Sequence, residues 1–399
     1  MRTMFSTDAP VRLMPWSPLH PSLGDLPSVA VMSTYPPTHC GLATFASALS
    51  KGMLDVGARE VGVIDVSGMV APTTSGPIVA SLQAHSSKSR IEVARVVNGF
   101  DFLLLQHEFG IFGGDDGCEI LDVLEDVHVP VVVTLHTVPL LPTNGQRRVL
   151  EALAARADVL VAMTNVARDR FVDLYEVDEA KVVVIPHGAT LPASSGVPDT
   201  ENFTFLTWGL LGPGKGIEWM IDAMAMVPEL KDRIRYVVAG QTHPKILAND
   251  GDGYRDMLKR RSRLLGVEDI IEFDDSYRTL DSLLDLIGRA TCVVLPYDSL
   301  DQITSGVLVD ALAARRPVIA TAFPHAVELL EEKAGLVVPH RDPVSLASAI
   351  RTVVNGEDKI SEMYDATADI AREHRWTAVA ARYLELGSQL VAADSAVAS

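Results

Sequence analysis

The sequence predicts an α/β protein that contains two doubly wound domains, each with a parallel sheet covered by helices. Short apolar runs rich in Val and Leu alternate with helical segments, which is typical of a parallel sheet that is buried on both faces. The alternation stops at the segment 192–200, whose Pro, Ser and Gly content is typical of a linker, and then restarts. A chain of 399 residues is also long enough for two or three domains.

The first half of the chain begins with a strand at Ser28–Ser33, followed by a loop and by a helix that starts near Gly41. The apolar runs and the helical periodicity after it predict the remaining elements. Strands are expected at 61–66, 100–106, 129–135, 159–163 and 182–185, and helices at 88–98, 144–156 and 165–174.

The second half repeats this pattern and ends in an amphipathic helix that starts at Trp376, with residues past about 392 expected to fray. Strands are expected at 203–208, 236–239, 270–273, 291–295, 318–320 and 335–338, with helices between them. We therefore predict an arm at 1–27, a first domain at 28–192, a second domain at 203–375 and a C-terminal helix at 376–392 that packs back on the first domain.

The charge of the chain limits its partners. It has 34 basic and 52 acidic residues, for a net charge of −18, which argues against nucleic acid and against broad attraction to anionic lipid. No apolar run reaches the ~18 residues that a membrane-spanning helix needs, so membrane contact is expected to be peripheral at most. Residues 1–27 contain five prolines and no continuous apolar core, which does not resemble a signal peptide.

The cysteines indicate a reducing compartment. Cys40, Cys118 and Cys292 are an odd number at wide spacings, so neither a disulfide framework nor a zinc pattern follows. We expect a cytoplasmic protein. No grouping of His, Cys and carboxylates has the spacing of a metal site.

An anion site is predicted after the expected strand 291–295. Thr304-Ser305-Gly306 can open a helix, because Ser305 is a good N-cap and Gly306 lets a ligand approach the backbone. The unpaired N–H groups of such a helix start bind phosphate or another anion. Asp310 lies one to two turns further on, within reach of a ribose if the anion is a nucleoside diphosphate.

A Gly-rich loop follows the expected strand 203–208. It runs from Gly209 to Gly216, and its glycines, Gly214 among them, let the backbone approach a ligand while Lys215 adds a positive charge against phosphate. It lacks the Gly-Lys-Ser/Thr ending of a Walker P-loop. An ordinary turn with a solvated lysine remains the alternative.

Histidines follow several expected strands. His107, His136 and His187 each lie at or just after a strand end of the first predicted domain. A lone histidine is often structural, but three at one sheet edge favour a site, with His136 the preferred candidate. Glu218, Asp298 and Asp301 are compatible with solvated surface acids.

These features occur in a family's order. They are Cys40-Gly41, His136, Pro-His-Gly at 186–188, Gly-x-Gly-Lys-Gly at 212–216, Ala-Gly at 239–240, Leu-Pro-Tyr at 295–297, Ser-Gly at 305–306, the run 310–321 and Trp376. In this order and at this spacing, residues 28–388 resemble the retaining glycosyltransferases of family 4. The resemblance implies the GT-B fold, in which two Rossmann-like domains face an inter-domain cleft.

The resemblance also implies a reaction and roles. A hexosyl group would pass from a nucleotide-diphosphate sugar to a carbohydrate, glycolipid or small-molecule acceptor, with no metal or other cofactor. Lys215, Gly214 and the amides near Ser305 and Gly306 would hold the diphosphate, as the positive charge and N–H groups of these segments allow. By the same resemblance, Asp310 would bind the ribose, Gln302 and His136 would contact the donor sugar, and Gly41 would allow the phosphate-proximal loop to close.

The chain departs from the family in two respects. Gln302 and Asp310 stand where the family usually has two glutamates, and Leu210 stands where it usually has an arginine. These departures keep two alternatives open, a nucleotide-sugar epimerase with Glu108 in proton transfer and a non-catalytic nucleotide-sugar-binding partner subunit. The base contacts are expected around 273–278, but the residues there do not identify the base.

Overall fold

The computed structural model describes residues 26–38, 40–68, 76–192, 201–276, 278–330 and 333–397. They form two compact units, one reaching Pro186 and completed by the residues from Trp376 onward, the other running from His187 to Arg375. Nearly all of the predicted arm 1–27, and the linker segment 193–200, lie outside the described residues.

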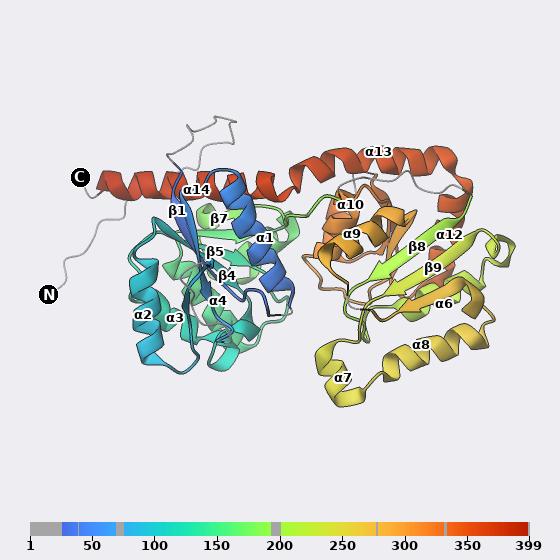
Figure 1. The fold of residues 1–399 in the computed structure, drawn as a ribbon, viewed down its shortest axis with the longest axis horizontal. Coiled ribbons are helices and arrows are strands. Elements are labelled where there is room, and N and C mark those ends of the chain that lie inside the picture. The colour runs from blue at the N-terminus through green and yellow to red at the C-terminus, as the bar shows by residue number, and fades with distance from the viewer. Residues whose placement is uncertain are drawn as a thin grey trace. The chain divides into compact units, whose positions relative to one another are not determined.

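The first unit is built on a parallel sheet of seven strands in the order β3-β2-β1-β4-β5-β6-β7. Figure 1 labels β1, β4, β5 and β7 of this sheet. The chain order reverses between β1 and β4, which is the switch point of a doubly wound sheet. Its strands are β1 (Ser28–Ser33), β2 (Glu60–Asp65), β3 (Ile78–Ser81), β4 (Phe102–His107), β5 (Val131–Leu135), β6 (Val159–Ala162) and β7 (Val182–Val184).

Three of the helices that connect these strands have Ser or Thr N-caps. Ser86, Thr143 and Thr164 each accept a hydrogen bond from a first-turn amide, which satisfies one of the donors that a helix start leaves unpaired. The helices are α1 (Gly41–Asp55), α2 (Ser87–Val97), α3 (Glu119–Leu124), α4 (Asn144–Arg156), α5 (Asn165–Leu174) and α14 (Trp376–Val397).

Strand β4 shows how the sheet is covered on both faces. Phe102 and Leu104 join the core that α1 and α14 complete, while the alternating Leu103 and Leu105, also buried, point to the opposite face. Together with the strand order, this confirms the predicted doubly wound architecture for this unit. The sequence analysis missed β3, because four residues on the edge of the sheet, half of them only partly buried, give a weak periodic signal.

The C-terminal helix α14 packs closely on α1. A side chain at Gly52 of α1 would come within 2.9 Å of the Trp376 carbonyl oxygen, and one at Gly387 within 2.3 Å of the Phe102 ring. The expectation that the chain frays past about 392 is wrong, because the helix continues to Val397. Its last turns contain alanines, which favour helix, and Leu390 is buried in the core of the unit.

The second unit is built on a parallel sheet of six strands in the order β10-β9-β8-β11-β12-β13. The switch point lies between β8 and β11. The strands are β8 (Phe203–Trp208), β9 (Ile234–Ala239), β10 (Ile271–Asp274), β11 (Cys292–Leu295), β12 (Val318–Thr321) and β13 (Gly335–Val338). The helices are α6 (Ile217–Ala225), α7 (Pro244–Asp250), α8 (Gly253–Leu264), α9 (Leu280–Arg289), α10 (Gly306–Ala313), α11 (Pro324–Leu330), α12 (Pro343–Asn355) and α13 (Glu357–Glu373).

Two apolar cores flank this sheet. Met220 of α6 and Ile350 of α12 belong to one of them, and Ile287 of α9 and Leu308 of α10 belong to the other. Both faces of the parallel sheet are therefore buried, and the second unit is doubly wound like the first. Across the described part of the chain, no helix has both the length and the apolar character needed to span a membrane.

Candidate functional site

The Gly-rich loop joins β8 to α6 in a conformation that requires glycine. Gly209, Gly214 and Gly216 have φ angles of 121°, 90° and 65°, and a Cβ atom at Gly216 would lie 1.7 Å from the carbonyl oxygen of Pro296. The loop therefore rests directly on the segment that follows β11. A hydrogen bond of 2.9 Å from the Asp298 N–H to the Gly214 carbonyl oxygen fixes the contact.

Lys215 lies half-buried in this loop. Its Nζ is 4.5 Å from the centre of the Tyr297 ring, a cation–π arrangement. Within the described residues, the ammonium group has no carboxylate partner. Burial lowers the pKa of Lys215, since removal from water disfavours the charged form. An anion bound beside it would compensate for that loss of hydration.

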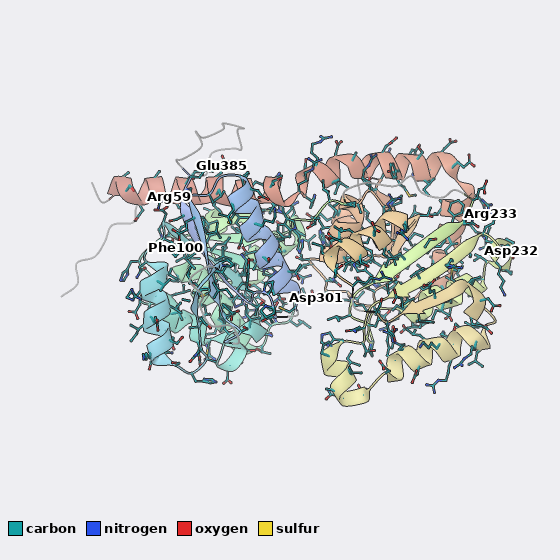
Figure 2. The ribbon with its side chains drawn as sticks, in the orientation of Figure 1. Arg59, Phe100, Asp232, Arg233, Asp301 and Glu385 are labelled. Carbon is teal, nitrogen blue, oxygen red and sulfur yellow. The ribbon has the colours of Figure 1, made fainter. Side chains whose placement is uncertain are left out.

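Asp298 organises the surroundings of the loop. Its Oδ1 accepts a hydrogen bond from the Trp219 indole N–H at 2.9 Å and lies 3.3 Å from Nε of Arg341. Glu218 accepts a hydrogen bond of 2.6 Å from the Tyr254 hydroxyl, so both of these acids are engaged by the protein. Asp301, which is labelled in Figure 2, is exposed.

Ser305 is the N-cap of α10, as expected. Its Oγ accepts a hydrogen bond from the Leu308 N–H at 3.3 Å. The Ser305 N–H donates to Nδ1 of His325 at 2.8 Å, and burial lowers the pKa of His325 to about 3, so its imidazole is neutral and can accept. The Ser305 N–H is therefore not available to an anion. The predicted anion site is left with the N–H groups of Gly306 and Val307, since the first N–H groups of a helix have no intrahelical partner.

His187 contacts Gly306 within the second unit. A Cβ atom at Gly306 would lie 3.1 Å from Nε2 of His187, and Nδ1 of His187 lies 2.6 Å from the Gly188 carbonyl oxygen. Burial lowers the pKa of His187 to about 4. The sequence analysis placed His187 in the first domain, but the Ala189 N–H donates to the His374 carbonyl oxygen at 2.6 Å. This bond ties the segment to the second unit.

Asp310 and Gln302 lie on either side of the α10 start. Asp310 is half-buried, no hydrogen bond of its carboxyl group occurs within the described residues, and burial raises its pKa to about 7. The Gln302 side-chain amide donates to the Thr304 carbonyl oxygen at 3.3 Å, and the Gln302 backbone carbonyl accepts from the His325 N–H. Gln302 is thus held in the loop before α10, near the helix start.

Leu210 is 44% exposed at the start of the Gly-rich loop. The cationic side chain that the family usually has at this position is therefore replaced by an exposed apolar one. Arg341 is attached to the same region through Asp298. Sequence reasoning did not select Arg341 or His325, because their positions depend on contacts between distant segments, and it included Tyr297 only as part of the Leu-Pro-Tyr motif.

The first unit holds His136 and Gly41. His136 follows β5, and its Nε2 lies 2.8 Å from Oε1 of Gln106. Gly41 is the first residue of α1, where an added Cβ would meet no atom within 4 Å. Cys40 caps this helix, its sulfur accepting from the Ala43 N–H at 3.4 Å.

His107 is a core residue. Its ring is fully buried, lies edge-on to Phe109 and stacks on Phe112, and burial lowers its pKa to about 3. The neighbouring Glu108 accepts hydrogen bonds from the Thr137 hydroxyl at 2.5 Å and from the Phe109 N–H at 3.0 Å. The expectation that three histidines share one sheet edge is therefore wrong. His107 points into the core, and His187 belongs to the other unit.

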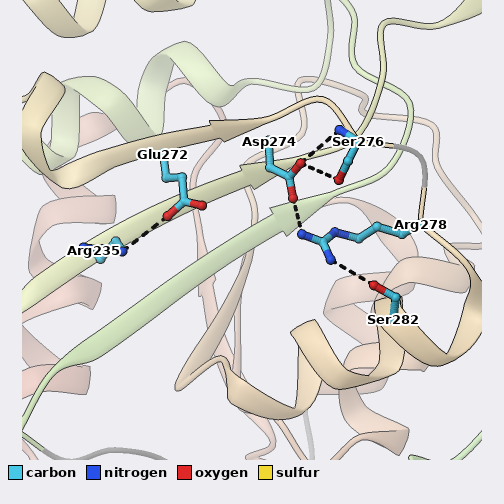
Figure 3. A network of polar contacts seen from close by, with 6 residues as sticks. All are labelled: Arg235, Glu272, Asp274, Ser276, Arg278 and Ser282. Carbon is cyan, nitrogen blue, oxygen red and sulfur yellow. Dashed lines mark hydrogen bonds and ion pairs between the residues drawn. The ribbon is translucent and has the colours of Figure 1, made fainter.

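The segment predicted to contact the base contains a polar network (Figure 3). Asp274, at the end of β10, accepts hydrogen bonds from the N–H and hydroxyl of Ser276 at 2.9 and 2.6 Å and from Arg278. The hydrogen bonds from Ser276 lower the pKa of Asp274 most. Arg278 also donates to the Ser282 hydroxyl at 3.0 Å, which ties the loop to the first turn of α9.

The three cysteines are not linked to one another. Burial raises the pKa of Cys292, so it stays a thiol in the core. Among the residues with described positions, no three His, Cys, Asp or Glu side chains come together as metal ligands. The prediction that no metal is needed stays a prediction.

Two family models match the chain. Residues 61–191 match the model described as Glycosyltransferase Family 4, and residues 202–356 match the model described as Glycosyl transferases group 1. The first match lies in the predicted first domain and the second covers most of the predicted second domain.

Curated relatives matched by sequence are described as D-inositol 3-phosphate glycosyltransferases. The chain is 30% identical to a D-inositol 3-phosphate glycosyltransferase of Kineococcus radiotolerans over 268 residues, which cover 61% of this chain and 58% of that protein. It is 27% identical to one of Corynebacterium glutamicum over 300 residues, with 67% and 68% coverage. The chain thus spans about three fifths of the length of the Kineococcus protein.

Solved structures share the fold. A glycosyltransferase from Rickettsia africae aligns with a TM-score of 0.69 at 15% identity over 91% of this chain and 98% of its own. Anabaena HepE, solved in complex with UDP and glucose, aligns with a TM-score of 0.67 at 17% identity over 90% and 98%. These likenesses, with the two doubly wound units, confirm the predicted GT-B fold class.

Proposed function

Because the chain belongs to glycosyltransferase family 4, we propose that it transfers a hexosyl group from a nucleotide-diphosphate sugar to an acceptor with retention of the anomeric configuration. The observation that carries the proposal is Lys215, a half-buried cation in a glycine-dependent loop, without a carboxylate partner in the described residues. Such a group stabilises the charge that develops on a leaving nucleoside diphosphate.

The diphosphate would lie between Lys215 and the first amides of α10. Both belong to loops that follow neighbouring strands, β8 and β11, on the two sides of the switch point, where ligands of doubly wound sheets bind. Gly214 would let the diphosphate approach the loop backbone, and the α10 N-terminus would add its partial positive charge. These groups would supply the positive charge that a divalent metal supplies elsewhere, so we propose that no metal is required.

The remaining residues would bind the sugar and the ribose. Asp310, one turn into α10, would accept hydrogen bonds from the ribose hydroxyls. Gln302 and His136 would contact the donor sugar, and Gly41 would expose the backbone at the start of α1. Support for these roles comes from the motif order of the family and from the positions of these residues. His136 and Gln302 lie in loops that follow strands, and Gly41 and Asp310 lie in the first two turns of helices.

The acceptor is proposed as a carbohydrate or a lipid-linked molecule. The curated relatives are named for D-inositol 3-phosphate, so inositol phosphates are the first acceptors to test, alongside free sugars and glycolipids. The net charge of −18 supports membrane contact that is peripheral at most. The odd number of widely spaced cysteines supports a cytoplasmic location.

The test is a donor screen followed by a turnover assay. Nucleoside diphosphates and their sugars are first ranked by the shift in melting temperature, since a ligand at 100 times its dissociation constant adds about 2.7 kcal/mol of stability. Acceptor-dependent release of nucleotide, with a product of the donor's anomeric configuration by NMR, supports the proposal. Isomerised donor sugar would favour an epimerase, and binding without turnover a partner subunit.

A further inference from the structure

Two buried polar residues interrupt the apolar face of the first unit's sheet. Gln106 and Thr134 are paired in register on the neighbouring strands β4 and β5, on the face where Phe102, Leu104 and Val132 contribute to the core of α1 and α14. Both side chains are fully buried. Burying an amide and a hydroxyl is unfavourable unless both are hydrogen-bonded. The hydrogen-bond partners of Gln106 and Thr134 therefore indicate which side chains these two residues position.

Their hydrogen bonds form a chain from α14 to His136. The Tyr383 hydroxyl of α14 lies 3.1 Å from Oγ1 of Thr134, the Gln106 amide Nε2 donates to the same Oγ1 at 3.4 Å, and Gln106 Oε1 lies 2.8 Å from Nε2 of His136. Because Gln106 presents its carbonyl oxygen to the ring, Nε2 of His136 is the nitrogen that carries the proton. The neutral ring is thereby held as the Nε2–H tautomer.

A second path from the same helix reaches the same ring. Trp376 packs edge-on to Phe45 with ring centres 5.0 Å apart, and Phe45 packs edge-on to His136 at 4.8 Å. Trp376 and Tyr383 are seven residues apart, which places them on one face of α14. Polar and aromatic contacts from this face therefore fix both the tautomer and the plane of the His136 ring.

We propose that α14 positions His136, with Tyr383 and Gln106 as positioning residues for the imidazole that contacts the donor sugar. The sugar contact in this inference rests on the proposed function. The tautomer and the orientation of the ring do not depend on that function. The helix that closes the first unit thus also sets which nitrogen of His136 carries the proton.

The first test is NMR of the full chain with ¹⁵N-labelled histidine, which identifies the tautomer without any substrate. The unaltered protein should give the Nε2–H pattern for neutral His136. Gln106→Leu should move the population toward Nδ1–H, and Tyr383→Phe, which keeps the ring volume, should move it in the same direction by less. Tyr236→Phe is the matched control, because it removes an equally buried tyrosine–threonine bond, to Thr207 at 2.8 Å, in the second unit.

The second test is a double-mutant cycle on turnover. Tyr383→Phe should lower kcat on the order of fivefold at nearly constant donor KM, and should have almost no further effect in a His136→Ala background, because the two residues act as one unit. A predominantly Nδ1–H tautomer, or equal effects of Tyr383→Phe in both backgrounds, overturns the positioning role. If no donor is turned over, the proposed function fails, whereas the NMR result still decides the positioning.

Discussion

Lys215 has the largest expected effect on turnover of any single side chain in the second unit. Lys215→Ala should lower kcat/KM on the order of 100-fold, because it removes a preorganised charge from the developing diphosphate. The melting temperature should change little, since the ammonium group has no described salt bridge to lose.

Arg233→Ala is the matched control for Lys215. Arg233 also lies over an aromatic ring, 5.4 Å from the centre of Phe203, but it immediately precedes β9, at the opposite end of the sheet (Figure 2). It should leave turnover unchanged. Near-normal turnover in Lys215→Ala would show that Lys215 has no role in the reaction.

Asp310 should make nucleotide binding depend on pH. Burial raises its pKa to about 7, so the carboxyl group is largely neutral at pH 6 and largely ionised at pH 8. The ionised form accepts stronger hydrogen bonds from ribose hydroxyls, so affinity for a nucleoside diphosphate should rise across this range.

The check on Asp310 is calorimetry at pH 6, 7 and 8 on the unaltered protein and on Asp310→Asn. Asp310→Asn should weaken the pH dependence of affinity that arises from the protein. Titration of the ligand phosphate should contribute equally to the affinities of both proteins. Parallel pH profiles for the two would remove Asp310 from the ribose site.

The Gly-rich loop is the element whose geometry is most constrained by packing. Gly216→Ala should destabilise the fold by more than the roughly 1–2 kcal/mol that a left-handed backbone costs a residue with a side chain, because the new Cβ would lie 1.7 Å from the Pro296 carbonyl oxygen. Gly251→Ala is the control, since Gly251 has a similar φ of 61° and open space around it. Equal losses of unfolding free energy in the two variants, measured by chemical denaturation, would show that the loop can move away from β11 at no cost in free energy.

The elements also differ in how well the sequence predicts them. The bounds of β1, α4, α5, β8 and β13 follow from local apolar runs and polar caps, and the sequence analysis placed them correctly. The roles of the site residues depend more on contacts between segments that are distant in the sequence. His107 has the same strand-end context as His136, and only the packing of Phe109 and Phe112 against it makes it a core residue. The Ser305 amide, similarly, is occupied by His325, twenty residues further along the chain.

For the whole molecule, the buried histidines should set the acid limit of stability. His107, His187 and His325 have pKa values lowered by burial to about 3, 4 and 3, against 6.5 when unfolded. Their folded pKa is depressed, so the stability they confer is present above pH 6.5 and is lost as the pH falls toward 4. Asp310 acts in the opposite direction, since its raised pKa removes stability as the pH rises from about 4 to 7.

The measurement is urea denaturation between pH 7.5 and 4.5 on the unaltered protein and on His107→Phe. Each histidine that stays neutral in the folded state adds a slope of up to about 1.4 kcal/mol per pH unit below 6.5, because unfolding takes up a proton. His107→Phe keeps an aromatic ring between Phe109 and Phe112 but removes the titrating group. The variant should therefore reduce the slope of the unfolding free energy against pH by the contribution of one proton, while preserving the free energy of unfolding at pH 7.5. An unchanged slope would mean that His107 is protonated, or hydrated, in the folded protein.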